Sequence, residues 1–97
     1  MRIYVTNLGR HDYSSLEKMG EVVFLTKGLV DRFKVSSLLI QIEDGLATSE
    51  PTDYIVVGSL SILCILASIA FVRKHDCLNL LLFSNGSYVK REIRWDA

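Results

Sequence analysis

The feature that most constrains this chain is an uncharged tract that runs from Tyr54 to Val72. A single helix through the whole tract would come close to crossing a bilayer, which takes roughly 20 apolar residues. Alternatively, the tract divides into a buried strand, a tight turn and a buried helix. The first interpretation predicts a single-span membrane protein. The second places a helix N-terminus at the end of a central strand, where α/β proteins often hold ligands.

The residues within the tract favour its division. Residues 54–57 are β-branched or aromatic, which suits a buried strand. Gly58-Ser59 then interrupts the apolar run and is typical of a turn. Residues 60–72 are apolar all round, as expected of a helix in a core or of a span. Arg73 and Lys74 suit a helix C-terminus and a cytoplasmic flank equally. We prefer the divided tract and keep the span as the alternative.

The composition indicates one globular domain, residues 1–97, that needs neither disulfides nor a metal for its core. Eleven basic and eleven acidic residues cancel, so neither nucleic acid nor a membrane is expected as a partner. Cys64 and Cys77 lie in apolar runs, and we expect buried free thiols in a reducing cytoplasm. No His or Cys pair has the spacing of a zinc site, so we predict no metal and no cofactor.

Periodicity and turn residues predict the remaining elements: strands at 2–6, 21–26, 77–83 and 88–95, a short helix from 14 to 19, and a longer helix from 36 to 46. The segment that begins at Ser14 has the form of a capping box, and Gly20 suits a left-handed cap. Ser36 or Ser37 can cap the longer helix. Asn85-Gly86 predicts a type I′ hairpin turn between the last two strands.

The resulting order, β-α-β-α-β-α-β-β, is typical of an α/β domain. Right-handed crossovers predict a single-domain three-layer sandwich, with helices on both faces of a mostly parallel five-stranded sheet. The most economical strand order is 2-1-3-4-5, with the charged C-terminal hairpin strand antiparallel at the edge. The chain then changes direction between the first and third strands, and a crevice is expected there at the carboxyl ends of the strands.

The loop after the first strand holds the first candidate site, with Asn7, Arg10 and His11 as predicted ligand-binding residues. Arg10 can pair with a phosphate, and His11 can donate or shuttle a proton near neutral pH. The simpler alternative is a solvated polar loop in which Asp12 or Ser14 caps the short helix.

The turn after the central strand holds the second candidate site, with Gly58, Ser59 and Ser61 as predicted ligand-binding residues. Gly58 would let a ligand approach the backbone, Ser59 would cap the helix, and the amide of Ser61 would point at a phosphate or carboxylate. The simpler alternative is an ordinary strand-to-helix turn with Ser59 as its N-cap. If the predicted topology holds, the two candidate sites face each other across the crevice.

The last strand carries a third candidate surface, with Lys90, Arg91, Arg94 and Trp95 as predicted partner-binding residues. Nucleic-acid bases can stack on such a surface, or an acidic partner can dock there. The simpler alternative is an edge strand whose charges prevent aggregation. The spacing of Ser, Cys and His residues gives no nucleophile with an adjacent base, so we predict no catalytic residue.

Four segments of the chain carry a resemblance to known proteins: 3–14, 23–28, 53–59 and 79–83. They resemble small α/β proteins carried by bacterial viruses and mobile elements. This resemblance implies an α/β fold and brings no catalytic residue with it. The layout is also similar to viral ring nucleases, which destroy cyclic oligoadenylate signals with a catalytic His in an Ile-Gly-His turn. This chain has Val57-Gly58-Ser59 at that turn, which puts cleavage in doubt, though not binding.

We therefore predict a small accessory protein of viral type that acts by binding, in counter-defence or host takeover, in the cytoplasm of the host. Its partner would be a nucleotide-like small molecule or a host protein. A homo-oligomer is expected because a 97-residue α/β fold buries limited surface by itself. One alternative is an enzyme of ring-nuclease type that acts on phosphodiesters or nucleotides, with His11 as acid or base. The other is the single-span membrane protein.

Overall fold

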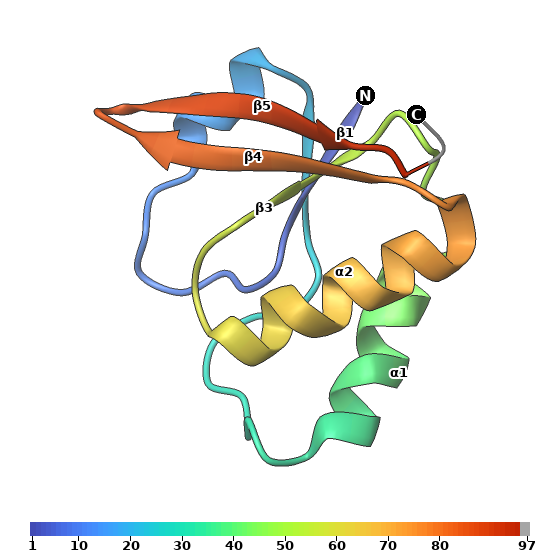
Figure 1. The fold of residues 1–97 in the computed structure, drawn as a ribbon. Helices are drawn as coiled ribbons and strands as arrows, with labels where there is room; N and C mark the ends of the chain where they lie inside the picture. The colour runs from blue at the N-terminus through green and yellow to red at the C-terminus, as the bar shows by residue number, and fades with distance from the viewer. Residues whose placement is uncertain (96–97) are drawn as a thin grey trace.

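The computed structural model describes residues 1–95 and confirms the predicted α/β architecture (Figure 1). The strands form one five-stranded sheet in the order β2-β1-β3-β4-β5. β5 runs antiparallel to β4, and the other neighbours are parallel. In chain order the elements are β1 (Arg2–Val5), the 3-10 helix η1 (Ser14–Lys18), β2 (Glu21–Phe24), α1 (Val35–Gly45), β3 (Tyr54–Val56), α2 (Ser61–His75), β4 (Leu78–Ser84) and β5 (Ser87–Ile93).

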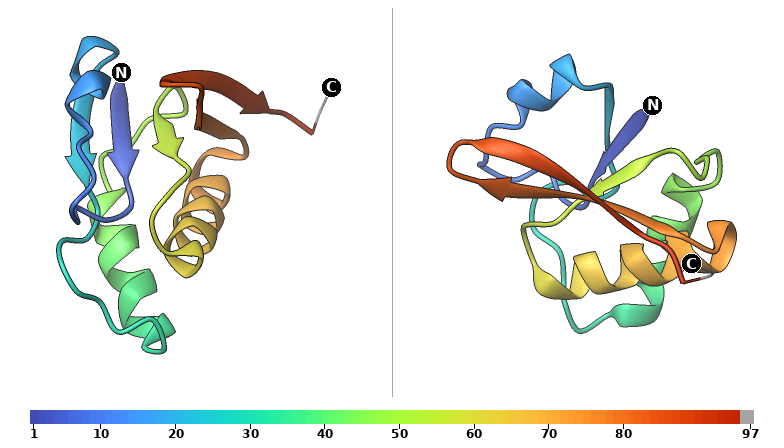
Figure 2. Two further views of the ribbon diagram at one scale, coloured as in Figure 1. Left: turned by 90° about the vertical axis from the view of Figure 1, so that its left-hand side faces the viewer. Right: turned by 45° about the horizontal axis from the view of Figure 1, so that its top comes forward.

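The two faces of the sheet are covered unequally. Figure 2 shows α1 and α2 together on one face, where they enclose a core that contains Ile42, Ile55 and Phe71. Within residues 1–95, the opposite face carries only η1 and its flanking loop, with Leu16 and Tyr13 packed on the sheet. From β1 to β2 the chain moves toward one edge of the sheet, and from β2 to β3 and then β4 it moves toward the opposite edge. Right-handed crossovers therefore place η1 opposite the two α-helices.

The uncharged tract is divided as predicted. β3 is buried along its whole length, the chain turns at residues 57–60, and α2 begins at Ser61. Within residues 1–95, no helix combines the length and the apolar character that crossing a bilayer requires. α2 buries Leu63 and Phe71 against the sheet and α1, whereas Ile65 and Ile69 are about half exposed. The helix is thus a core element on one side only.

The hairpin follows the sequence prediction, and the two cysteines are free as predicted, although Cys64 is less buried than expected. Asn85 and Gly86 have φ angles of 49° and 84°, as a type I′ turn requires. This turn sets the register of β4 and β5, in which Ser84 lies opposite Ser87. Cys64 and Cys77 are free thiols, Cys77 buried and Cys64 half-buried.

Three predicted helix caps are wrong. No side chain caps η1; instead the Asp12 carboxylate accepts the amide of Ser14 at 2.8 Å, just before the helix. Lys34 occupies the N-cap position of α1, two residues before Ser36, and no side chain among the described residues caps this helix. Gly20 is not in the left-handed region. A Cβ at Gly20 would lie 2.5 Å from the carbonyl oxygen of Met1, so close packing of the backbone requires this glycine.

The amino ends of the strands are joined by a network of buried polar groups. The Asp53 carboxylate accepts the backbone amides of Arg2 and Glu50, each at 2.8 Å. The Asn79 side-chain amide donates to the carbonyl oxygens of Pro51 and Asp53, each at 2.7 Å. Asp53 and Asn79 are almost fully buried. The Asn79 side-chain oxygen has no hydrogen-bond partner among the described residues, but the other bonds join β1, β3 and β4, so this end of the sheet is a structural element.

Candidate functional site

A cavity of about 340 Å³ opens at the carboxyl ends of β1, β3 and β4, at the point where the chain changes direction. We call it the switch-point cavity. It brings together residues from both predicted ligand-binding clusters, although about fifty residues of sequence separate them. Five of the six predicted ligand-binding residues line it: Asn7, Arg10, His11, Gly58 and Ser59. The sixth, Ser61, lies outside this lining, in the first turn of α2.

Ser59 does not cap α2, contrary to the prediction. Leu60 occupies the N-cap position, and no side chain among the described residues caps the helix. The Ser59 hydroxyl lies 2.7 Å from the Thr6 hydroxyl instead. Ser59 also has a φ of 60°, a left-handed conformation that is uncommon for residues other than glycine. The Leu63 amide donates to the carbonyl oxygen of Leu60 at 3.1 Å, so the first-turn amides that remain available to a ligand are those of Ser61 and Ile62.

Gly58 is held in place by a residue that the sequence analysis treated only as a buried thiol. The Cys64 thiol donates to the carbonyl oxygen of Gly58 at 2.8 Å and lies 3.4 Å from its amide nitrogen. A Cβ at Gly58 would lie 3.9 Å from the Tyr13 hydroxyl, an ordinary contact. The turn therefore does not require glycine for steric reasons, and a larger residue there would project beside the cavity.

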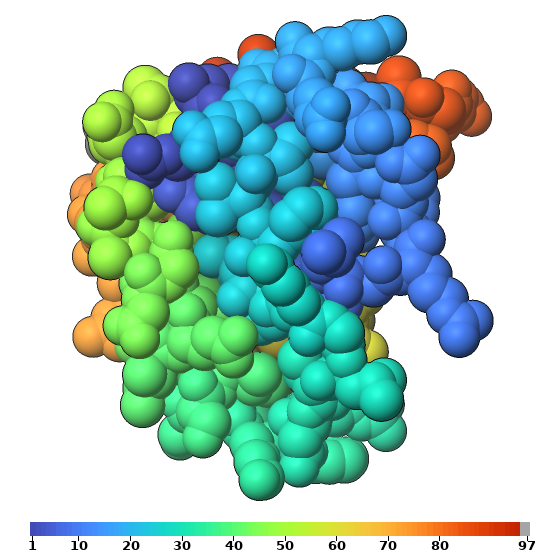
Figure 3. Space-filling model, turned by 180° about the vertical axis from the view of Figure 1, so that it is seen from behind, coloured from blue at the N-terminus to red at the C-terminus, as the bar shows by residue number. Residues whose placement is uncertain are grey.

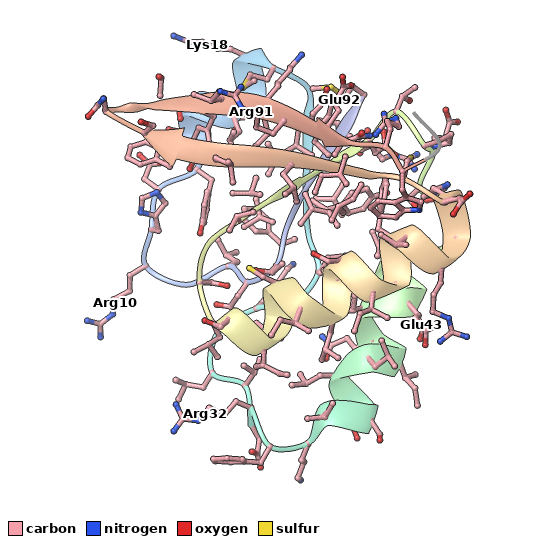
Figure 4. The ribbon with its side chains drawn as sticks, viewed as in Figure 1. Arg10, Lys18, Arg32, Glu43, Arg91 and Glu92 are labelled. Carbon is pink, nitrogen blue, oxygen red and sulfur yellow. The ribbon has the colours of Figure 1, made fainter. Side chains whose placement is uncertain are left out.

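Asn7 and the two residues predicted with it have different roles in the loop. The Asn7 side-chain amide donates to the Thr26 hydroxyl at 2.9 Å and to the carbonyl oxygen of Gly28 at 3.0 Å. These bonds fasten the loop after β1 to the end of β2, so Asn7 is chiefly a positioning residue. Arg10 and His11 are exposed, and neither forms a salt bridge within residues 1–95. Figure 4 shows the Arg10 side chain extending outward from this loop.

Aromatic rings form one wall of the switch-point cavity, and the sequence analysis did not identify it. The His11 ring centroid lies 4.6 Å from that of Tyr13 and 6.4 Å from that of Phe83. Phe83 in turn lies 5.1 Å from Tyr88 across the hairpin. Burial raises the pKa of Tyr13 above its ordinary value, so its hydroxyl stays protonated at neutral pH. The Asn-Gly turn was the available signal, because its register places Phe83 opposite Tyr88.

A second hollow of about 860 Å³ lies on the other side of the loop after β1. We call it the outer hollow. It opens between this loop and the segment after β2, the blue and cyan segments that border it in Figure 3. Its walls are mainly apolar and include Leu29 and Phe33, whose exposed fractions are 104% and 79%. Asn7, Gly9 and Arg10 line both hollows.

The four residues predicted to bind a partner lie on β5 or just after it: Lys90, Arg91, Arg94 and Trp95. They do not form one basic patch. Lys90 and Arg91 point to opposite faces of the sheet, because neighbouring residues of a strand alternate; Figure 4 labels Arg91 on this strand. Arg94 lies 3.8 Å from the Glu92 carboxylate, and the Trp95 indole donates to Asp76 at 3.4 Å. Partner binding through these residues stays a prediction.

Comparison with known proteins places the chain among proteins of bacterial viruses. A family model described as Phage Pam3 gp32-like protein matches residues 2–96. No curated protein and no solved structure matches the chain. The match covers nearly the whole sequence and confirms the expected likeness to small phage proteins. The chain belongs to the Phage Pam3 gp32-like protein family.

Proposed function

We propose that this phage protein acts by binding, and that the switch-point cavity takes a nucleotide-like molecule of the host. Sequestering such a molecule would serve counter-defence or host takeover. One observation carries the proposal: the cavity combines Arg10, which forms no salt bridge within residues 1–95, with a wall of aromatic rings, and its lining ends at Ser59, two residues before α2 begins. A nucleotide has the matching parts, since it combines an anionic phosphate with a planar base.

The phosphate would be held by Arg10 and the start of α2. An arginine makes short, charge-assisted hydrogen bonds to phosphate oxygens and can use two N–H groups at once. The first turn of a helix adds free amides and the positive end of the helix dipole. Ser59 lines the cavity and lies two residues before Ser61, the first residue of α2, so the helix start is close to the rim that Arg10 lines.

The base would lie against the rings of His11, Phe83 and Tyr88. Stacking of a base on aromatic side chains tolerates any sequence and stabilises binding by about 1–3 kcal/mol per base. The Tyr13 hydroxyl can donate a hydrogen bond to the base or sugar. A volume of about 340 Å³ is at the lower end of the range for ligand pockets, roughly 300–1,000 Å³. The cavity by itself therefore suits one nucleoside with its phosphate.

NMR titration with the four ribonucleoside 5′-monophosphates, and with inorganic phosphate, tests the proposal. We expect shifts of the amides at residues 9–13 and 58–62 for at least one nucleotide. The Arg10→Ala variant should bind this nucleotide about tenfold more weakly, since it loses one charge-assisted contact. Arg91→Ala is the matched control and should bind normally. Absence of shifts with all four nucleotides, or equal losses in both variants, would contradict the proposal.

An enzyme acting on phosphodiesters is the second candidate, and the position of His11 favours it. This histidine lies in the same cavity as Arg10, where it can transfer a proton to a reacting oxygen. Incubation with linear and cyclic oligoadenylates, followed by chromatography, would reveal cleavage. Turnover that disappears in His11→Ala would favour the enzyme, whereas intact substrates after long incubation would favour binding alone.

A host protein remains the alternative target of the binding activity. The candidate contacts are the side chains on the outer strand of the hairpin: Lys90, Arg91, Arg94 and Trp95. If a host protein co-purifies with the natural chain, replacing Lys90 and Arg91 together with alanine should release it. Retention of the partner by this double variant would exclude the β5 surface.

A further inference from the structure

We infer that the ligand of this site is a dinucleotide, two nucleosides joined by one phosphodiester, with one base in each hollow and the phosphate at their shared rim. The inference rests on the proposed function of the switch-point cavity and extends it to the outer hollow. It names the class of ligand that would fill both.

The first argument is the continuity of the two hollows. Asn7, Gly9 and Arg10 line both of them, and so form a common rim. On the opposite side, Ser59 lines the switch-point cavity and its neighbour Leu60 lines the outer hollow. The N-terminus of α2 and the Arg10 side chain therefore both lie at the boundary. A phosphodiester that links two nucleosides would lie at this boundary.

The second argument is the chemistry of the outer hollow. Its apolar lining includes Leu29, Val30 and Phe33, and the Phe33 ring is largely exposed to water. The Arg32 guanidinium lies 5.2 Å from the centroid of this ring. An exposed aromatic ring beside an arginine offers a stacking surface for a nucleic-acid base. Figure 4 shows Arg10 and Arg32 on the same side of the molecule.

The third argument is the charge of the combined lining. It contains two cations, Arg10 and Arg32, and among its described residues Asp31 is the only acidic one. Asp31 already accepts the amide of Phe33 at 3.0 Å, which keeps its carboxylate within the loop. The two arginines and the one aspartate together leave one positive charge. One phosphodiester carries one negative charge, so charge balance favours a dinucleoside monophosphate.

Calorimetric titration can compare the 5′-monophosphates with the matching dinucleoside monophosphates ApA, GpG, CpC and UpU. We expect one dinucleotide to bind at least tenfold more tightly than its mononucleotide, because the second base stacks on Phe33. The Phe33→Ala variant should lose this gain and keep the mononucleotide affinity. Phe83→Ala should weaken both ligands. Ile40→Ala, which removes an exposed apolar side chain from α1, is the matched control and should change neither affinity.

The possible outcomes separate this inference from the proposed function. If mononucleotides bind and the dinucleotides gain nothing, the inference is overturned while the proposed function stands. If neither class binds, both fail. A dinucleotide gain that survives Phe33→Ala also overturns the inference, because the second base would then lie elsewhere. A melting temperature equal to that of the natural chain should verify that Phe33→Ala, an exposed substitution, remains folded.

Discussion

The polar groups at the two ends of the sheet differ in their burial and in their hydrogen bonding. At the amino ends of the strands, Asp53 and Asn79 are buried and bonded to nearby backbone groups. At the carboxyl ends, Arg10 and His11 are exposed, and the first turn of α2 has no side-chain cap. Groups that satisfy each other hold a fold together, whereas groups left open to a cavity are available for ligands. The contrast marks one end as structural and the other as functional.

Two glycines follow the same division. Gly20, at the amino end, has no room for a side chain because the carbonyl oxygen of Met1 occupies that space. Gly58, at the carboxyl end, has room for a methyl group beside the Tyr13 hydroxyl. The backbone at Gly20 is thus packed to contact, while Gly58 has free space beside it. Substitutions at matched positions can test how far this difference extends.

The largest expected effect is the loss of Asp53. Its carboxylate bonds two backbone amides, and a hydrogen bond to a charged group contributes about 1.5–3 kcal/mol. Asp53→Ala should therefore lower the free energy of unfolding by about 3 kcal/mol or more, measured by urea denaturation. Asp12→Ala is the control at the carboxyl end. It removes one exposed bond to the Ser14 amide and should lower the free energy of unfolding much less than Asp53→Ala does. Equal losses would remove the contrast between the two ends.

The glycine pair should give the next largest difference. Gly20→Ala would force the backbone away from Met1 and should destabilise the fold by about 2 kcal/mol, as overpacked substitutions do. Gly58→Ala should change stability by less than about 1 kcal/mol. If the site proposal holds, the same variant should weaken nucleotide binding, because the methyl group would project beside the cavity, whose lining includes Gly58. Thermal denaturation and the titrations above measure the two effects separately, and an unchanged Gly20→Ala variant would refute the packing argument.

Substitutions of Ser59 should change the stability of the fold by a smaller amount. The side chain of Ser59 stabilises the turn through Thr6, whereas its left-handed backbone conformation destabilises it. Ser59→Ala loses the contact with Thr6 and keeps a side chain in the left-handed region. Ser59→Gly loses the same contact but relieves the backbone strain. The glycine variant should therefore be about 1 kcal/mol more stable than the alanine variant. Equal stabilities in chemical denaturation would show that the turn relaxes out of the left-handed conformation.

The smallest expected effect is the pH dependence that His75 contributes, far from the site. Burial, followed by the nearby charge of Lys74, lowers the pKa of His75 below its ordinary value of 6.5. The unfolded chain therefore takes up this proton more readily than the folded chain. The contribution of neutral His75 to the free energy of unfolding is complete above pH 6.5. It is lost as the pH falls through the lowered pKa of the folded state. His75→Gln should flatten the stability profile in this range, and an unchanged slope would contradict the assignment.

Much of the fold could be predicted because its signals are local or follow from topology. The β-branched residues before Gly58 and the apolar residues after it predict the division of the tract. The Asn-Gly turn predicts the hairpin, and the crossover rule predicts the strand order. The helix caps could not be predicted, because a serine hydroxyl near a helix start has several acceptors within reach. Ser59 bonds Thr6, more than fifty residues away, and its sequence neighbours give no indication of this contact.

The position of the candidate site was predicted from the sequence, but several of the residues that form its walls were not. Loop positions next to the switch point follow from strand order, so Arg10, His11 and Ser59 were identified. Phe83 required the hairpin register, and Cys64 required the path of the turn in three dimensions. The outer hollow depends on residues 28–34, whose apolar pattern fits neither a helix nor a strand. Such irregular segments take their shape from tertiary contacts, which sequence periodicity does not report.

The unequal lengths of β3 and β4 have a mechanical consequence for the cavity. β4 pairs with β3 only through Leu80 and Leu81, and from Leu82 to Ser84 it pairs with β5 alone. Phe83 thus stands on an overhanging two-stranded ribbon, whereas the facing side of the cavity is anchored in the middle of the sheet. Isolated two-stranded ribbons bend and twist more readily than a sheet interior. The end of the β4–β5 ribbon that carries Phe83 can therefore move toward or away from the rest of the cavity as a ligand enters. This movement would cost little, because the other strands of the sheet would keep their pairing.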